Sequence, residues 1–353
     1  MSVLKNKSIT ELYFECHTNA FVSTRQKGDT LVNQALDTKI ERESQWTHKG
    51  STVMVAQSYY EQSVLSTNAE AIDNIKTKTK SMIHEQYQTI HWDHISNLAV
   101  QEEFCRISDI MDADISWKAD IHCLPRGVAK FLLNSILKSL PTKDNLRKWG
   151  KTISDSCDLC GNPETIGHVL SGCKTMLDQG RYTWRHDSVL NVITEFVNKS
   201  ENKNIQVHSD LGDKPWTIPP DILATSDRPD LVVLDPCEKC ISILELTVPY
   251  ETNIQSRHQY KCHKYAHLCI DLQSLGFSVK YFAIEIGCRA FISQPNSKRL
   301  HAFLKSVKGL KFNNRDFRSF KSTLCKTVIT SSFVVFKSRF CKSWISPLSY
   351  CAV

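Results

Sequence analysis

Apolar and polar residues are spaced differently in successive parts of this chain, and each spacing predicts a different kind of element. Residues 1 to about 110 are polar, with a weakly helical pattern that predicts surface helices joined by loops. From Trp117 to Trp149 apolar residues recur at helical spacing, which predicts a packing helix with Pro125 near its start and Pro141 as its stop. Its apolar residues are Ile121, Leu124, Val128, Phe131, Leu132, Ile136 and Leu140.

Strands are indicated later, by two β-rich runs, LVVL and ISILELTV, which the turn-prone sequence DPCEKC separates. The two runs predict a hairpin. If its loop is the four residues Pro236 to Lys239, Asp235 pairs with Cys240, and counting back five residues on each side brings Asp230 opposite Glu245. Directly opposed residues on one sheet face have Cβ atoms about 4.5 to 5.5 Å apart. The hairpin therefore places two carboxylates side by side.

This carboxylate pair predicts a cation site. Asp230 alternates with Val232 and Leu234, which indicates that its sheet face is at least half buried. Two carboxylates at this spacing repel one another, and a hard divalent cation between them removes the repulsion. Mg²⁺ or Mn²⁺ is the expected ion. The alternative is a pair of solvent-facing acids on an exposed sheet face.

A third carboxylate, Asp187, lies upstream in RYTWRHDSVL, where it follows Arg185 and His186. Apolar residues then recur at helical spacing and predict a helix that packs on the sheet. These residues are Val189, Leu190, Ile193 and Phe196. A further strand, Val279 to Gly287, would complete the sheet.

A helix after the hairpin is predicted to bring cations toward the acids. Asn253 could cap this helix, which runs to about Leu275 and carries Arg257, Lys261 and Lys264 near one face. A lysine held near two metal-binding acids can orient the attacking water or stabilise charge on a phosphate, as phosphodiester hydrolysis requires. The alternative is a set of ordinary basic residues on a solvated face.

The densest group of metal-ligand residues is CDLCGNPETIGHVLSGC. Its pattern is C-x2-C-x7-H-x4-C, formed by Cys157, Cys160, His168 and Cys173, and this set suits a closed, structural tetrahedral zinc site. Gly161 follows the first pair and relieves the tight turn. The alternative is four unligated residues. Closed zinc knuckles bind RNA, DNA or protein, or only pin helices together, so the motif specifies no partner.

A second zinc site is a further hypothesis. It would require the hairpin loop to meet the basic face of the following helix. The residues of such a site would be Cys237, Cys240, Cys262, His263, His267 and Cys269. The favoured alternative is that these side chains are packed thiols and hydrogen-bonded imidazoles.

Composition limits the class of protein. The chain has 353 residues, of which 41% are hydrophobic and 23% charged, enough for two or three globular units. Its start lacks a long apolar core, and no later run approaches the length of a membrane span, so neither secretion nor a membrane location is expected. The fourteen cysteines then indicate reduced thiols, some of them on metal, in a reducing compartment.

The net charge of +7 is concentrated in the last part of the chain. Beyond Ala290 the only acid is Asp316, and aromatic residues are interleaved with the cations, which favours a nucleic-acid partner. The alternative is a helical cap with core aromatics and solvated lysines. The twelve cations are Lys298, Arg299, Lys305, Lys308, Lys311, Arg315, Arg318, Lys321, Lys326, Lys337, Arg339 and Lys342.

These motifs together resemble a known family. PD, fourteen residues and ELTVPYE, preceded by RHD and the knuckle, resemble the carboxy-terminal part of site-specific non-long-terminal-repeat retrotransposon proteins. The resemblance covers about Leu124 to Trp344 and includes LPRGVAKFLLN, LPTKDNLRKWGK and IGCRAF. It implies a zinc knuckle followed by a restriction-like endonuclease of the PD-(D/E)xK class. The implied fold is α/β, with a restriction-endonuclease-like mixed sheet flanked by helices and helical N- and C-terminal regions.

The resemblance also implies residue roles. Asp230 and Glu245 correspond to the magnesium ligands of the endonuclease, and the Leu246 carbonyl could add a further oxygen. Asp187 of RHD resembles the accessory acid of the first helix.

One position departs from the wider nuclease class, which has a lysine two residues after the glutamate where this chain has Thr247. The family supplies a lysine from the next helix instead, and Lys261 is the first choice, with Lys264 second. No YADD-type polymerase motif is present, so the resemblance implies a truncated element product that does not copy RNA.

The sequence thus predicts a nuclear, metal-dependent DNA endonuclease that nicks a strand, with DNA and possibly element RNA as partners. The alternative is a catalytically inactive nucleic-acid-binding remnant. Five parts are expected: a polar helical region (1–116), a packing-helix linker (117–153), the knuckle (154–180), the endonuclease (181–290) and the basic aromatic tail (291–353).

Overall fold

The chain forms two compact units, one running to Glu102 and the other beginning at Glu103. The computed structural model describes residues 9–45, 52–65, 72–97, 103–104, 106–107, 111–114, 116–211, 218–219 and 221–344. Within these ranges, no helix combines the length and apolar character needed to cross a membrane.

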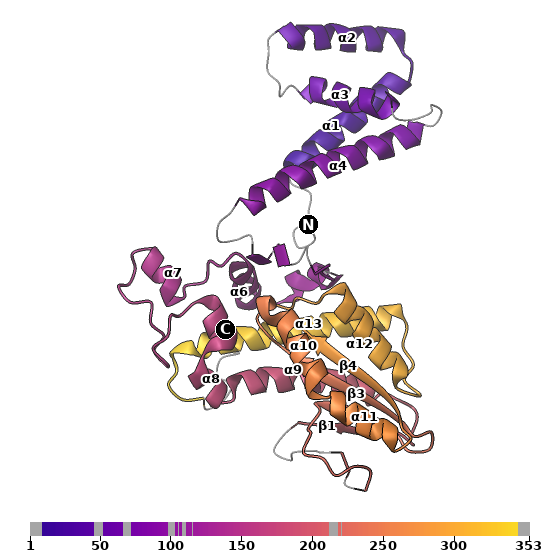
Figure 1. Ribbon diagram of the computed structural model, residues 1–353. Coiled ribbons are helices and arrows are strands. Elements are labelled where there is room, and N and C mark those ends of the chain that lie inside the picture. The colour runs from indigo at the N-terminus through magenta and orange to yellow at the C-terminus, as the bar shows by residue number, and fades with distance from the viewer. Residues whose placement is uncertain are drawn as a thin grey trace. The chain divides into compact units, whose positions relative to one another are not determined.

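The first unit is helical in its described part, as the polar pattern predicts (Figure 1). It consists of α1 (Ile9–Gln26), α2 (Thr30–Gln45), α3 (Thr52–Leu65) and α4 (Ile72–Ser96). Helix α1 packs against both α3 and α4. The apolar residues buried between the helices include Phe21, Val22, Ala56, Tyr59, Ile75 and Ile83.

The second unit is built around a four-stranded mixed sheet, which confirms the expected α/β class. Its strands are β1 (Gln206–Ser209), β2 (Leu231–Asp235), β3 (Cys240–Thr247) and β4 (Ser278–Glu285), in the order β1-β2-β3-β4. The β1–β2 and β2–β3 pairs are antiparallel, whereas β3 and β4 are parallel. Strands β2, β3 and β4 match the predicted runs, and β1 was not predicted.

The β2–β3 hairpin has the predicted register. Asp235 pairs with Cys240 and Leu231 pairs with Leu244, and the next residues along the two segments are Asp230 and Glu245. All five residues of β2 are buried. The predicted burial of this sheet face is therefore confirmed.

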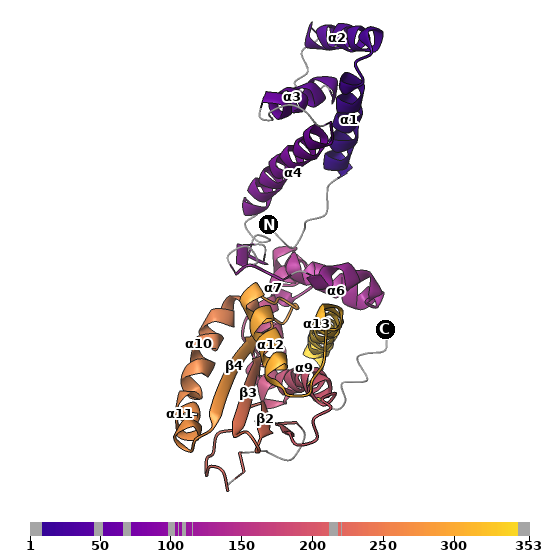
Figure 2. The ribbon, with the colours of Figure 1, turned by 90° about the vertical axis from the view of Figure 1, so that its right-hand side faces the viewer.

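Helices cover both faces of the sheet (Figure 2). Helices α9 (Arg181–Val197) and α13 (Asn314–Lys337) pack together on one face. Helices α10 (Ile254–Lys264) and α11 (Ala266–Ser274) lie on the other face. The core beneath this second pair includes Val232, Leu234, Ile241, Ile243, Tyr265, Leu268 and Leu272.

The single helix expected from Asn253 to Leu275 is divided in the structure. A 3₁₀ turn (Glu251–Asn253) precedes α10, no side-chain cap bond comes from Asn253, and the helix breaks at Tyr265. Tyr265 is fully buried, and its hydroxyl donates to the carbonyl oxygen of Arg228 at 2.9 Å. The break accordingly falls at a residue that is anchored to the loop before β2.

The predicted packing helix corresponds mainly to α6 (Arg126–Ile136), which Pro125 precedes as the N-cap residue. A 3₁₀ segment (Ser116–Cys123) comes before it, and the short α7 (Lys143–Lys148) follows Pro141. The buried face of α6 comprises Val128, Phe131, Leu132, Ser135 and Ile136.

A buried arginine joins this helical segment to the sheet. Arg289 is fully buried, donates to the Glu251 carboxylate at 2.7 Å and donates to the Ser135 carbonyl oxygen at 3.0 Å. Gly287 must be a glycine because a Cβ atom there would lie 2.6 Å from Oε1 of Glu251. The IGCRAF motif is thus explained by close packing around an ion pair.

The basic tail forms α12 (Gln294–Ser306) and α13, and most of its aromatic rings are core. The buried rings are Phe291, Phe303, Phe317, Phe320, Phe333 and Phe336. These six rings fill the space between α12, α13 and the rest of the unit, which agrees with the alternative of a helical cap with core aromatics, and the nucleic-acid partner stays a prediction. Lys321 is also buried, in an ion pair with Asp114, whereas Lys298 and Lys305 are exposed.

Candidate functional site

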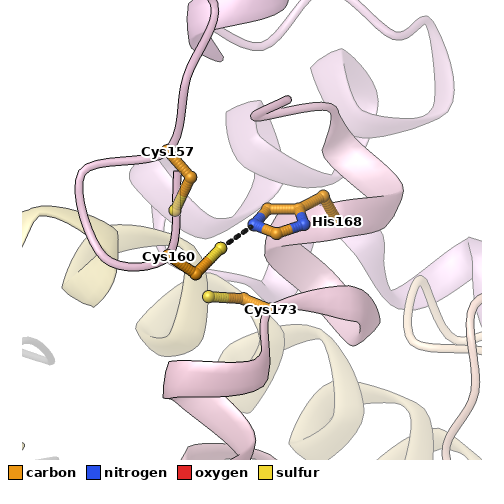
Figure 3. A group of neighbouring side chains, drawn as sticks. All are labelled: Cys157, Cys160, His168 and Cys173. Carbon is orange, nitrogen blue, oxygen red and sulfur yellow. Dashed lines mark hydrogen bonds between the residues drawn. The ribbon is translucent and has the colours of Figure 1, made fainter. Parts of the chain in front are cut away.

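The four predicted zinc ligands converge on one point (Figure 3). One ligand atom from each of Cys157, Cys160, His168 and Cys173 lies within 4.8 Å of all the others. The Cys160 Sγ to His168 Nε2 distance is 3.3 Å. A tetrahedral zinc ion with bonds of about 2.3 Å to sulfur and 2.0 Å to nitrogen would separate these two atoms by roughly 3.5 Å. The donor set and its spacing therefore fit zinc.

Local backbone geometry creates this convergence. Gly161 has a φ of 77°, which a glycine adopts without strain, and its N–H donates to the Cys157 carbonyl at 2.9 Å. A π-helical turn, His168–Gly172, then carries the histidine, and Cys173 follows it. The tight turn after Cys160 is as predicted.

Burial shifts the pKa of two of these ligands in opposite directions. Burial lowers the pKa of His168, which keeps the imidazole neutral and its lone pair available. Burial, together with a smaller effect of the neighbouring Cys157, raises the pKa of Cys173 to about 12. A bound cation reverses this effect on a thiol, since coordination favours the thiolate.

The predicted carboxylate pair is also brought together, at the end of β2 and β3. Asp230 is 9% exposed and Glu245 only 1%. The backbone N–H of Asp230 donates to Glu245 Oε2 at 3.1 Å, and the N–H of Leu246 donates to Asp230 Oδ2 at 2.7 Å. Both acids are held by neighbouring backbone, so their positions are fixed by the sheet register.

Lys261 rather than Lys264 reaches the acids. The Lys261 ammonium pairs with Glu245 Oε1, whereas Lys264 donates to the Tyr265 hydroxyl at 2.8 Å. The hydroxyl of Tyr281 donates to the Lys261 carbonyl at 2.9 Å and braces this turn of α10.

His186 is a site residue to which the sequence assigned no role. Its Nε2 lies 3.2 Å from Asp230 Oδ2 and 3.3 Å from the Leu246 carbonyl oxygen, while its Nδ1 lies 3.0 Å from Asp187 Oδ1. Asp187 therefore shares the site, but the ring of His186 stands between it and Asp230. The position of His186 beside Asp187 in the RHD motif was the sequence signal that pointed to it.

The electrostatics of this group follow from burial and opposed charges. Burial and the neighbouring Asp230 raise the pKa of Glu245 and Lys261 lowers it, so that the pKa lies at about 7. Burial lowers the pKa of His186, but its hydrogen bonds to Asp187 and Asp230 outweigh that effect and raise it to about 10. Two cationic side chains thus balance the buried acids.

These residues open into a pocket of about 560 Å³. His186, Asp187, Asp230 and Lys261 line it together with Arg257. Thr247 also lines it, and its hydroxyl oxygen is buried with no hydrogen-bond partner among the described residues. Asp230, Leu246 and Thr247 all line this pocket and offer oxygen ligands, which are the ligands that a hard divalent cation prefers.

The possible second zinc site does not assemble. In the described ranges, only the knuckle brings three or more cysteine, histidine, aspartate or glutamate side chains within ligand distance of each other. Cys262 lies instead 3.7 Å from His258 Nε2, and Cys240 starts β3.

Comparison with protein families agrees with the knuckle. The model of a zinc-binding domain in reverse transcriptase matches residues 99–179, which include all four ligands. This match indicates a retroelement-derived protein and supports zinc as the metal of the cluster. No curated protein is significantly similar to the chain.

Proposed function

We propose that the second unit is a metal-dependent DNA endonuclease of restriction-like fold, derived from a non-long-terminal-repeat retrotransposon protein. One observation carries this proposal: the buried residues Asp230 and Glu245 are in contact, the Lys261 ammonium pairs with Glu245, and Asp230 and Lys261 line one pocket. In an intact element the nick would prime reverse transcription. The nucleus is the expected place of action because the DNA target is there.

The residues of the site would have distinct tasks. Asp230, Glu245 and the Leu246 carbonyl would hold Mg²⁺ or Mn²⁺, which supplies an acidified water and neutralises charge on the phosphate when bound. Lys261 would stabilise negative charge that develops on the phosphodiester. Arg257 is exposed at the pocket and would attract the DNA backbone.

Plasmid nicking tests the proposal directly. Supercoiled plasmid should become nicked circles with Mg²⁺ or Mn²⁺ and remain intact with EDTA. If the zinc-loaded protein binds duplex DNA but never nicks it, the alternative holds: a nucleic-acid-binding remnant. Thr247, at the position of the usual lysine, is the observation that favours this alternative.

Replacing Lys261 should slow nicking without abolishing it. Lys261→Ala should lower the nicking rate by roughly a hundred- to a thousand-fold, because the charge beside the phosphate is lost while the acids remain. Lys264→Ala is the matched control, since Lys264 also lies on α10 but donates to the Tyr265 hydroxyl and not to the acids. This variant should retain most activity. Equal losses in both variants would contradict the assignment of Lys261.

Exposed cations of the tail should contribute to DNA affinity. Removing residues 298–353 would delete α13 and its packing on α9, so neutralising point variants are the better test. The double variant Lys298→Gln/Lys305→Gln should reduce the slope of log affinity against log salt by up to about two, because each phosphate contact contributes about 0.9. The pair Lys39→Gln/Arg42→Gln in the first unit changes the net charge equally and is the control. An unchanged slope in the α12 variant would mean that this helix is only a cap.

A further inference from the structure

Helix α9 contacts both the zinc knuckle and the carboxylate site through neighbouring side chains. Tyr182, Arg185 and His186 lie within two turns of one helix. His186 contacts Asp230, as described above. Tyr182 and Arg185 point into buried surroundings on the knuckle side.

The Tyr182 hydroxyl contacts the backbone of two zinc-ligand residues. It donates to the carbonyl oxygens of Val169 at 2.9 Å and His168 at 3.2 Å, and it accepts from the N–H of Cys173 at 3.1 Å. These three contacts tie the backbone of the knuckle to α9, so the shape of the knuckle and the position of α9 depend on each other.

Arg185 continues this connection to the sheet. It is 2% exposed and donates to the Leu170 carbonyl at 2.8 Å and to the Val248 carbonyl at 2.9 Å. Leu170 belongs to the π-helical turn of the knuckle, whereas Val248 directly follows β3, three residues after Glu245. One buried guanidinium therefore ties together the zinc turn, α9 and the strand that carries the candidate metal ligand.

We propose that Tyr182 and Arg185 are positioning residues that couple the order of the zinc knuckle to the carboxylate site. When the knuckle loses its zinc, the carbonyl groups of its π-helical turn no longer hold these side chains. Residues His186 and Asp187 then lose their fixed position against Asp230. The catalytic consequence rests on the proposed nuclease function, but the structural coupling does not.

Amide hydrogen exchange of the full chain tests the coupling without any activity. Removing zinc from the parent with a chelator should speed exchange in residues 154–180 and also in residues 181–187 and 244–249. Tyr182→Phe and Arg185→Lys should show faster exchange in these last two segments while zinc is still bound, and chelation should add little. If Tyr182→Phe fails to hold zinc, Arg185→Lys carries the test through its contact with Val248 outside the knuckle.

Asn191→Ala is the matched control, because Asn191 is exposed on the same helix and bonds only to Glu195 of α9 among the described residues. It should behave as the parent. Exchange that changes only in residues 154–180 after chelation would overturn the proposal.

A kinetic measurement then separates coupling from catalysis. Both variants should lower the kcat for plasmid nicking about ten- to a hundred-fold with little change in KM, since a small misplacement of catalytic groups costs rate more than binding. A parent that shows coupled exchange but no nicking would overturn the nuclease proposal and leave the coupling intact. Unchanged kcat in both variants of a nicking-competent parent would overturn the catalytic part alone.

Discussion

Asp230→Asn and Glu245→Gln should each abolish Mg²⁺-dependent nicking, with losses of about a thousand-fold or more. Each substitution removes one anionic oxygen ligand, and without the ion the attacking water is neither positioned nor acidified. DNA binding should survive, because both side chains are buried and the exposed cations are unchanged. Nicking rates and affinities measured on the same preparations check this.

The amide variants suit this test better than alanine. Removing the acids altogether would relieve their repulsion, but alanine at Asp230 would also leave the Leu246 N–H without its acceptor. Asparagine can still accept that bond. Glu238→Gln is the matched control, since Glu238 is exposed at the far end of the same hairpin and pairs with Lys308. Mg²⁺-dependent nicking by either amide variant at the rate of the parent would contradict the proposed centre.

The hairpin shows how far sequence reasoning can reach. A four-residue loop fixes register, and a period of two along each strand then decides which side chains share a face. These two local rules brought Asp230 and Glu245 together, because β3 runs through Glu245 and the paired part of β2 reaches Leu231, the residue next to Asp230. Spacing likewise placed the four knuckle residues together, since their ligand groups are close in sequence.

Tertiary contacts explain what the sequence did not predict. His186 reaches Asp230 across 44 positions in the sequence, and only the packing of α9 on the sheet brings them together. The break falls at Tyr265, whose hydroxyl donates to the carbonyl oxygen of Arg228 in a distant loop. The tail rings alternate with cations along the sequence, but a helix turns them to its buried side. Periodicity alone does not show which partner covers that side.

The second large effect concerns the knuckle, where Cys160→Ser should lose bound zinc. A serine oxygen is a poor replacement for a thiolate, and a closed structural site with three good ligands binds zinc far more weakly than one with four. Because metal binding and folding are coupled in such sites, residues 154–180 should become unfolded or readily cleaved by protease. Native mass spectrometry should show one zinc ion per parent chain and none in the variant.

The location of the damage makes this test specific to the knuckle. Cys237→Ser, in the exposed hairpin loop, removes a thiol that belongs to no described ligand group and should keep one zinc ion. The sheet core behind β2 and β3 should remain folded in Cys160→Ser, because the apolar core beneath α10 and α11 contains no knuckle residue. Zinc-free parent protein prepared without chelator, or full zinc retention in Cys160→Ser, would show that these four side chains do not form the metal site.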